Sequence, residues 1–384
     1  MSGNQILILG GGVGGLVASN VLAERLGDRA KVTLVERKDK FQFPPSYPWL
    51  MLGMRGPEQV QRDLSVLRRK GIRVANEEVV SIDVGKRSVG TKSGEFSYDY
   101  LVVSLGAEYA PHTIPGLLEH AHHIYDLESA TRFKDAVEKF RGGTIAIGIS
   151  RTPFKCPAAP YEVALLLEDY YTKKGLRDKL KFEFFTPEPG PVPAVGPDIG
   201  NKVLEVLRSR GINYHPKLRL KEIRQNDLSF EGGETMRFDL LFCVPPHVAP
   251  PPVVKAGLTN ETGWIPVNPR TMETSHEGVY AVGDVTSIPT PSGYVPFLPK
   301  AGVFAHGQAE VAARNIATKI TGRGKATTWD GKGSCFLEVG GGQSAFVKGN
   351  FLSEPRPEIE FHMPGRVWHA QKVIFEKYWM RHWF

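Results

Sequence analysis

Two cysteines far apart in the chain are the residues best suited to chemistry. Cys156 lies in the segment 154–162 (FKCPAAPYE) and Cys335 in the segment 333–338 (GSCFLE). A pair of thiols can cycle between a disulfide and two thiolates, and so can exchange two electrons. With three cysteines in 384 residues, the chain is no disulfide-stapled scaffold, which favours a redox role for the pair. The third, Cys243, follows an apolar run and is expected to be a buried structural thiol.

A glycine-rich loop near the start of the chain predicts a dinucleotide-binding site. The apolar strand 5–9 leads into the loop 10–15 (GGGVGG), and the helical stretch 16–26 follows it. In such a loop one glycine allows the tight turn, a second lets the backbone approach a pyrophosphate, and a third lets helix and strand pack closely, with the phosphates on the helix N-terminus. These roles fall to Gly10, Gly12 and Gly15.

An acidic residue follows the next strand, where a ribose would be contacted. The apolar strand 31–35 ends at Glu36, and a carboxylate there can accept hydrogen bonds from the adenosine ribose hydroxyls. We assign Arg37, the next residue, to the same site. The alternative is a glycine-rich turn in an unrelated α/β protein, but the order of strand, helix, strand and acid favours the dinucleotide site.

The segment 143–156 (GTIAIGISRTPFKC) has the strand of a second dinucleotide-binding fold without its glycine loop. Gly148 holds the first glycine position, whereas Ser150 and Pro153 replace the next two. A side chain at the second position crowds a pyrophosphate, and a proline removes a backbone donor. We therefore do not expect NAD(P)H to bind there, and Cys156 follows directly.

Two later segments resemble glycine signatures of flavoproteins with two dinucleotide-binding domains. The segment 98–107 (YDYLVVSLGA) resembles the second signature, and the segment 274–285, ending in VYAVGDV, resembles the third. The resemblance implies FAD as the cofactor and places Gly106 in its site. Gly283 permits close approach of the backbone, and the Asp284 carboxylate can accept a hydrogen bond from a ribityl hydroxyl.

Over nearly its whole length the chain resembles sulfide:quinone oxidoreductases and their relatives, the flavocytochrome c sulfide dehydrogenases. The resemblance rests on the degraded second loop, the segments 156–162 (CPAAPYE) and 297–308 (FLPKAGVFAHGQ), the late Cys335 and the aromatic, basic segment 368–384. It implies that Cys156 and Cys335 face the flavin ring and form a disulfide or a sulfur-bridged pair.

The implied reaction is the oxidation of sulfide to polysulfide or elemental sulfur, with electrons passing through FAD to a membrane quinone. Hydrosulfide would attack one sulfur of the pair, leaving a persulfide on one cysteine and a thiolate on the other. We expect Cys335 to be the flavin-proximal thiol and Cys156 to carry the sulfur. Glu162 is a candidate proton carrier, although an acid close to a helix start can also simply favour the helix N-terminus.

Lys300 and two aromatic residues complete the implied site. The resemblance places a lysine of this type near the flavin or the quinone, where a fixed cation favours anionic reduced flavin. The alternative is a solvated surface lysine. Phe336, beside Cys335, and Trp368 are the candidates for stacking on the quinone ring. No metal ligands are assigned.

The C-terminal segment 367–384 predicts a helix that lies in the membrane interface. Aromatic residues alternate there with Lys372, Lys377 and Arg381; aromatic rings suit the headgroup boundary and cations suit anionic lipid. The alternative is a terminal helix packed on its own domain or on another subunit, and a homo-oligomer remains open. The net charge of +7 fits a membrane surface, and no nucleic-acid-binding motif accompanies it.

The rest of the sequence indicates a peripheral membrane protein on the cytoplasmic face. No apolar run reaches the roughly 18 residues that a membrane-spanning helix needs. The N-terminus (MSGNQ) leads directly into the first strand, with no signal segment before it.

We expect an α/β fold of two Rossmann-like, doubly wound, mostly parallel domains, followed by an amphipathic membrane-associating region. The FAD-binding domain would comprise 1–112 and 270–322, the second domain with the degraded NAD loop 113–269, and the flavin-, quinone- and membrane-facing region 323–384. Two other functions stay open. A type II NADH:quinone oxidoreductase should have an intact second loop, and a non-catalytic flavin redox sensor needs FAD but not both thiols.

Overall fold

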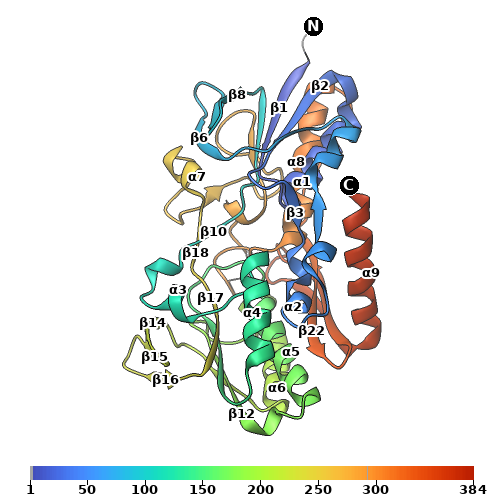
Figure 1. Cartoon of the computed structure of the whole chain (residues 1–384). Helices are drawn as coiled ribbons and strands as arrows, with labels where there is room; N and C mark the ends of the chain where they lie inside the picture. The colour runs from blue at the N-terminus through green and yellow to red at the C-terminus, as the bar shows by residue number, and fades with distance from the viewer. Residues whose placement is uncertain (1–2, 292) are drawn as a thin grey trace.

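The computed structural model describes residues 3–291 and 293–384, and its first sheet combines segments from both ends of the sequence. The five strands of this sheet are all parallel and lie in the order β20-β9-β1-β2-β5; β1 and β2 lie side by side at the top of Figure 1. Since β1 is central, the glycine-rich loop emerges at the carboxyl edge, where ligands bind in such sheets. The strands are β1 (Asn4–Leu9), β2 (Ala30–Val35), β5 (Arg73–Ala75), β9 (Tyr100–Val103) and β20 (Val279–Ala281).

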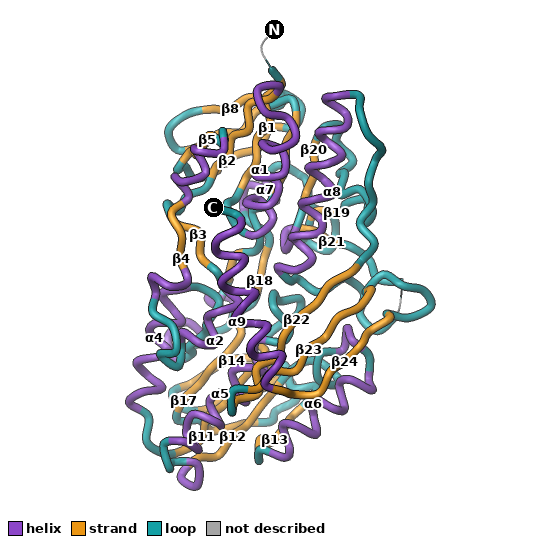
Figure 2. Tube along the Cα trace, turned by 90° about the vertical axis from the view of Figure 1, so that its right-hand side faces the viewer, coloured by secondary structure: helices purple, strands orange, loops and turns teal. Residues whose placement is uncertain are grey.

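Helices cover one face of this sheet, and an antiparallel sheet covers the other. The helices α1 (Val13–Leu26) and α8 (Gly302–Thr321) pack side by side over the first face (Figure 2). The core on the second face is formed with a three-stranded meander and one short helix. These elements are β6 (Val79–Asp83), β7 (Ser88–Thr91), β8 (Glu95–Ser97) and α7 (Pro251–Lys255).

The second sheet repeats this plan. Its parallel strands lie in the order β13-β12-β11-β17, with helices on one face and an antiparallel meander on the other. The strands are β11 (Gly143–Ile149), β12 (Leu180–Phe185), β13 (Ile212–His215) and β17 (Leu240–Val244). The helices are α4 (Leu127–Lys139), α5 (Ala159–Lys173) and α6 (Pro197–Ser209), and the meander is β14 (Leu220–Arg224), β15 (Asp227–Phe230) and β16 (Thr235–Arg237).

The two parallel sheets confirm the expected α/β fold, but the sheets are not doubly wound. One face of each carries antiparallel strands, because the connection before the strand β9, and again before β17, is a β-meander instead of a helix. The sequence predicts doubly wound sheets because apolar strands alternate with helical segments. The strands of these meanders are short and polar, so no such apolar pattern marks them.

The last part of the chain is a long antiparallel sheet followed by a helix. The strands β22 (Lys332–Gly340), β23 (Gln343–Asn350) and β24 (Glu358–Gly365) lead into α9 (Arg366–His382). The strand β22 packs against α5, and α9 runs back beside the first sheet's helices (Figures 1 and 2). This region therefore contacts both halves of the molecule.

Short elements complete the fold. The strands β10 (Glu108–Tyr109) and β18 (His247–Val248) pair with each other between the two large sheets (Figure 1). The others are β3 (Lys40–Gln42), β4 (Gln61–Asp63), α2 (Tyr47–Leu50), α3 (Leu117–His120), β19 (Ile265–Pro266) and β21 (Thr286–Ser287). Among the described residues, no helix has both the length and the apolar character needed to cross a bilayer.

Candidate active site

Cys156 lies in a constrained turn between β11 and α5. Its φ of 55° falls in the left-handed region, which residues with a side chain rarely adopt and which often marks functional sites. Its N–H donates to the Lys300 carbonyl oxygen (2.7 Å), and its own carbonyl oxygen accepts from the Ala159 N–H (2.9 Å). These bonds hold Cys156 beside the Lys300 segment, just before α5 begins.

Cys335 comes to the same place from the other end of the chain. It lies in β22, paired in register with Val347 of β23. Its Sγ is 3.3 Å from the Phe336 carbonyl oxygen. Because β22 packs against α5, the helix that follows Cys156, the antiparallel sheet is what brings the second thiol to the first.

The two thiols interact electrostatically and are kept protonated. Burial raises the pKa of Cys156, and a charge on Cys335 would raise it further. Burial, followed by the Glu162 carboxylate, raises the pKa of Cys335 to about 12. Cys335 is nevertheless exposed, so solvent reaches a thiol that protein atoms otherwise crowd. Both cysteines are free thiols.

A buried ion pair lies beside these thiols. Glu162, on α5, is 4% exposed, and Lys372, on α9, is 5% exposed. Lys372 Nζ donates to Glu162 Oε1 (2.8 Å), and the Glu338 N–H, on β22, donates to the same oxygen (3.0 Å). Glu162 raises the pKa of both thiols, and the Lys372 ammonium lowers it. Glu162 is therefore fixed by three elements within electrostatic range of the sulfurs.

Lys372 was expected among the membrane-facing cations of the C-terminal helix, and that expectation is wrong. The buried face of α9 comprises Lys372, Glu376, Trp379 and Met380, with Trp383 just beyond the helix. The large apolar side chains exposed on α9 are Val367, Ile374, Phe375 and Tyr378. The spacing of 372, 376, 379 and 383 follows the helical period, which is the pattern that could have marked Lys372 as inward-facing.

The glycine-rich loop has the geometry that the sequence predicts. Gly10 has a φ of 93°, and a side chain at Gly15 would collide with the Gly10 carbonyl oxygen. At Gly12, by contrast, a Cβ would meet no described atom within 4 Å, which leaves room for a pyrophosphate. No side chain caps the start of α1, so its first N–H groups are available to phosphate oxygens. Gly106, with a φ of 68°, likewise has open space beside it.

The carboxylate of Glu36 is fixed at the edge of this loop. Its Oε2 accepts from the Gly11 N–H (2.6 Å) and its Oε1 from the Lys38 N–H (2.9 Å). Each oxygen keeps a lone pair for a ribose hydroxyl. Arg37 pairs at the surface with Glu108 (3.4 Å).

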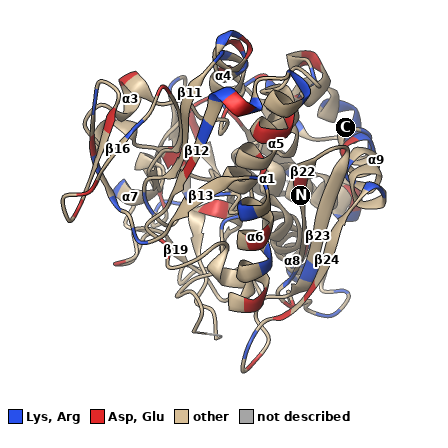
Figure 3. Cartoon of the chain, turned by 90° about the horizontal axis from the view of Figure 1, so that it is seen from below, with Lys and Arg blue, Asp and Glu red and all other residues tan. Residues whose placement is uncertain are grey.

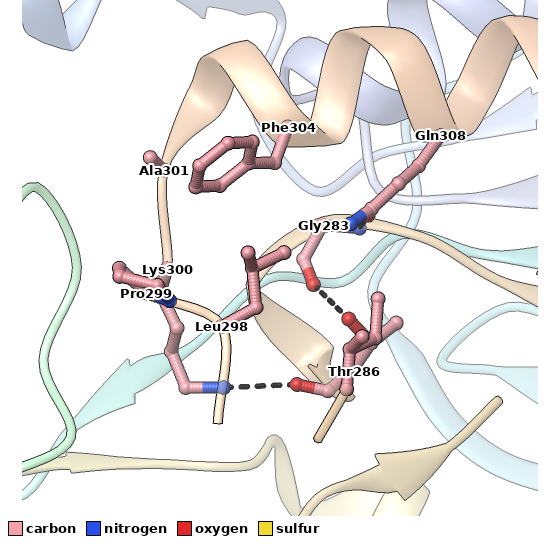
Figure 4. A pocket seen from close by; sticks show the side chains of 9 residues that line it. Gly283, Thr286, Leu298, Pro299, Lys300, Ala301, Phe304 and Gln308 are labelled. Carbon is pink, nitrogen blue, oxygen red and sulfur yellow. Dashed lines mark hydrogen bonds between the residues drawn. The ribbon is translucent and has the colours of Figure 1, made fainter. Parts of the chain in front are cut away.

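A small pocket lies between the Gly-Asp segment and the start of α8 (Figure 4). Lys300 Nζ donates to the carbonyl oxygens of Asp284 (2.6 Å) and Thr286 (3.2 Å) and lies 3.4 Å from the centre of the Trp264 ring system. Burial lowers the pKa of Lys300 to about 7. This environment excludes the alternative of a solvated surface lysine. Gly283, whose N–H donates to Gln308 Oε1 (2.7 Å), lines the same pocket.

The side chain of Asp284 carries a buried atom that calls for a ligand. Its Oδ1 is buried and has no hydrogen-bond partner within the described part of the chain. An unsatisfied buried group of this kind costs about 1–3 kcal/mol. A ribityl hydroxyl would satisfy it, so the residues present fit FAD.

The two quinone candidates belong to one aromatic cluster. The Phe346 ring stacks on Trp368 (centroids 4.9 Å apart, planes at 12°) and contacts Phe336 (4.9 Å). Phe375, on α9, lies 6.3 Å from Phe336. The sequence did not indicate Phe346 and Phe375 as quinone-stacking candidates, because only the fold places them beside Phe336.

The degraded second loop is tied to the neighbouring strands. Ser150 Oγ donates to the Val244 carbonyl oxygen (2.5 Å), and Arg151 Nη1 donates to that of Leu220 (2.6 Å). The Phe185 ring lies against Gly148, where a Cβ would overlap it. These contacts hold the loop segment against the backbone of β17 and β14 and close the space beside Gly148. Cys243, in β17, is buried as expected and lies in the core between this sheet and its meander.

Comparison with known proteins places this site in a family. Residues 4–309 match the model of the pyridine nucleotide-disulphide oxidoreductases. The chain is 28% identical to the sulfide-quinone reductase of Aquifex aeolicus over 392 residues, covering 98% of this chain and 90% of that protein. It is 26% identical to the mitochondrial sulfide:quinone oxidoreductase of Mus musculus, covering 93% and 80%.

A solved structure agrees. The crystal structure of the sulfide:quinone oxidoreductase from Aquifex aeolicus superposes with a TM-score of 0.90 at 26% identity, over 98% of this chain and 90% of that one. A type II NADH:quinone oxidoreductase of Staphylococcus haemolyticus is more distant, at 23% identity over 83% of each chain.

The chain belongs to the pyridine nucleotide-disulphide oxidoreductase family, a class of flavin enzymes, and FAD is confirmed as its cofactor. Within this class, the resemblance to sulfide:quinone oxidoreductases expected from the motifs is confirmed by the relatives and by the solved structure.

Proposed function

We propose that this protein is a sulfide:quinone oxidoreductase that oxidises sulfide with Cys156 and Cys335 and passes the electrons to a membrane quinone. One observation carries the proposal. Two thiols from distant segments interact beside the Lys300 segment, in a chain whose second dinucleotide loop has Ser150 and Pro153 in place of two glycines. A reductant smaller than NAD(P)H suits this arrangement.

FAD would be held along the first sheet. The pyrophosphate would lie at Gly12 and the start of α1, the ribose at Glu36, and the ribityl chain at Gly283 and Asp284. When bound, FAD supplies a two-electron acceptor that can pass electrons on to a quinone. We keep 1–112 with 270–322 as the FAD-binding domain, 113–269 as the second domain, apart from α7, which packs on the first sheet, and 323–384 as the region facing flavin, quinone and membrane.

The thiol pair would carry out the sulfur chemistry. Hydrosulfide attacks one sulfur of the oxidised pair, so that a new sulfur–sulfur bond forms and the bond between the cysteines breaks. The incoming sulfur remains on Cys156 as a persulfide, and the thiolate is left on Cys335. Each further sulfide that extends the chain to polysulfide or elemental sulfur must give up two electrons, which bound FAD would accept and the quinone would then take up. The Lys372 ammonium stabilises the thiolate, since it lowers the pKa of both cysteines.

Glu162 and Lys300 have separate roles in this proposal. Glu162, bonded to Lys372 and within electrostatic range of both thiols, takes up the proton that hydrosulfide brings. Lys300 holds the Asp284 segment in place through two carbonyl oxygens, and its ammonium form, present below its pKa of about 7, adds a cation at the cofactor site.

The quinone would enter at the aromatic cluster, between Phe336, Trp368 and the membrane. Membrane contact would use the exposed face of α9, on which Ile374, Phe375 and Tyr378 lie beside Lys377 and Arg381. Basic stretches are visible along α9 in Figure 3. The protein would thus be peripheral, on the cytoplasmic face, with sulfide and quinone as its substrates.

The test is anaerobic bleaching of the bound flavin on addition of sulfide or, separately, NADH, followed by reoxidation with decylubiquinone. Sulfide alone should bleach the flavin rapidly, and both Cys156→Ala and Cys335→Ala should lose this reaction. Cys243→Ala is the matched control, because Cys243 is a buried core thiol and its loss should leave sulfide bleaching intact. Bleaching by NADH, or none by sulfide, would return the thiols to a structural or sensory role.

A further inference from the structure

A buried carboxylate–histidine pair adjoins the thiol site and has no part in the chemistry described so far. Glu338, on β22 three positions after Cys335, is 1% exposed. Its carboxylate oxygens lie 2.9 and 3.1 Å from His369 Nδ1, on α9. The His369 ring also packs edge-on against Trp49, with centroids 5.8 Å apart. The pair is thus locked between the antiparallel sheet and the terminal helix.

The pair is continuous with the ion pair beside the thiols. The Glu338 N–H donates to Glu162 Oε1 (3.0 Å), and a Glu338 carboxylate oxygen lies 3.9 Å from Lys372 Nζ. Polar contacts therefore run from Glu162 through Lys372 and Glu338 to His369. The His369 side chain is 24% exposed, so this end of the series meets solvent.

The buried charges in this series do not balance without one more proton. Glu162 and Glu338 would carry two negative charges against the single positive charge of Lys372. The other charged groups near Trp49, Arg55 and Glu376, pair with each other (2.8 Å) and add no net charge. An uncompensated buried charge is costly, and two carboxylates around one cation bind a proton more tightly than one alone.

The electrostatics of Glu338 agree with this charge count. Burial raises the pKa of Glu338 and Glu162 raises it as well, while Lys372 and His369 oppose the rise. One proton is therefore shared by the Glu338–His369 pair. The pair and the two thiols share neighbours, because Glu162 and Lys372 act on Cys156, on Cys335 and on Glu338.

We propose that Glu338 and His369 form the proton exit of the thiol pair. When the Cys335 S–H bond breaks, the sulfur keeps the electron pair, the proton passes by way of Glu162 to the Glu338–His369 pair, and His369 releases it to water. No electron changes hands in this step. The need for this proton exit rests on the proposed function, because oxidation of hydrosulfide releases protons at the thiols. Both residues act through the thiols and are positioning residues.

Substitutions of Glu338 and of His369 should shift the pH at which the Cys335 thiolate forms in opposite directions. Glu338→Gln removes one of the two carboxylates around Lys372 and leaves that cation to Glu162 alone, so the Cys335 thiolate should form at lower pH. His369→Asn leaves Glu338 charged without its cationic partner, so the thiolate should form at higher pH. The substitutions act on Cys335 through Glu162 and Lys372, so we expect shifts in its titration of at most about one pH unit.

The experiment measures alkylation of Cys335 by iodoacetamide as a function of pH in the reduced, FAD-loaded protein, read by peptide mass spectrometry. Neither sulfide nor quinone is added. The expected result is a downward shift for Glu338→Gln, an upward shift for His369→Asn, and, in the double variant, the profile of Glu338→Gln alone. Glu338→Asp keeps the negative charge but moves it away from His369, so its alkylation profile should shift upward as that of His369→Asn does. This variant replaces any test variant that loses FAD.

Matched controls are available elsewhere in the chain. Glu360→Gln removes an exposed carboxylate of β24 that pairs with Lys348 (2.9 Å), and His306→Asn removes an α8 histidine that pairs with Glu310 (3.5 Å). Neither should move the Cys335 profile. Shifts in the same direction for both test variants, or shifts no larger than the controls, overturn the relay. Because the readout needs no sulfide oxidation, that result leaves the proposed function to the bleaching test.

Discussion

The docking of α9 gives a prediction with a built-in control in two adjacent residues. Trp379 is 3% exposed, and its ring lies 5.0 Å from that of Phe41 and 5.3 Å from that of Phe43. Tyr378, the preceding residue, is 58% exposed. The structure therefore places two neighbouring aromatic residues, which the sequence alone treats alike, on an exposed and a buried face of the helix.

The size of the effect follows from this burial. Replacing a fully buried tryptophan with alanine costs about 3–5 kcal/mol. If α9 opens as a local unit, this cost appears as an increased open population, on the order of 100-fold or more. Tyr378→Ala, a surface change, should alter stability by no more than about 0.5 kcal/mol.

Hydrogen exchange of the 366–384 amides, followed by mass spectrometry, measures the open population directly when reclosing is fast. Trp379→Ala should accelerate exchange of these amides by about 100-fold or more, and Tyr378→Ala by no more than about threefold. Equal rates in the two variants would refute the docked orientation of α9. Wild-type amides that exchange at the rate of an unfolded peptide would refute docking altogether.

Three further predictions concern the site itself. Crowding by protein atoms and the Glu162 carboxylate raise the pKa of Cys335, so at pH 8 alkylation of Cys335 in the reduced protein should be slower when folded than when unfolded in urea; equal rates would contradict this electrostatic environment. Burial lowers the pKa of Lys300 from 10.5 to about 7, so between these pH values the unfolded state holds a proton that the folded state lacks. The difference in thermal midpoint between the wild type and Lys300→Met should therefore rise as the pH increases from about 7 to 10.5. A constant or falling difference would contradict the lowered pKa of Lys300. Trp368→Ala should raise the KM for quinone severalfold while sulfide still bleaches the flavin at the wild-type rate, as stopped-flow absorbance would show, and a loss of sulfide bleaching instead would place Trp368 at the thiols.

Local patterns were sufficient for the dinucleotide site. Gly10, Gly12, Gly15 and Glu36 lie within one strand–helix–strand unit, where the spacing of glycines and apolar residues dictates the backbone path. The same holds for the altered second loop, because Ser150 and Pro153 act on the backbone next to them. The first loop and the strand of the second were therefore predictable residue by residue.

The meanders and the terminal sheet could be predicted less well from the sequence. Short polar strands such as those of β14 to β16 carry little periodic apolar pattern, so the sequence suggested doubly wound sheets. The strands β22 to β24 pair over long antiparallel registers, and which face of β22 meets α5 depends on packing partners more than 150 residues away along the chain.

The sequence by itself determined the glycine-rich loop and the family resemblance, because these depend on residue types at short spacings, and it supplied the two thiols of the proposed chemistry as candidates. Only the tertiary structure decided the electrical environment of those thiols. The neighbours of the thiols come from a strand and a helix far from Cys156 along the chain, namely Glu338, His369 and Lys372. The sequence predicts that Lys372 faces the membrane, but in the folded protein it is buried and pairs with Glu162. The energy of a buried charge depends on every neighbour within a few ångströms, and those neighbours exist only once the chain has folded.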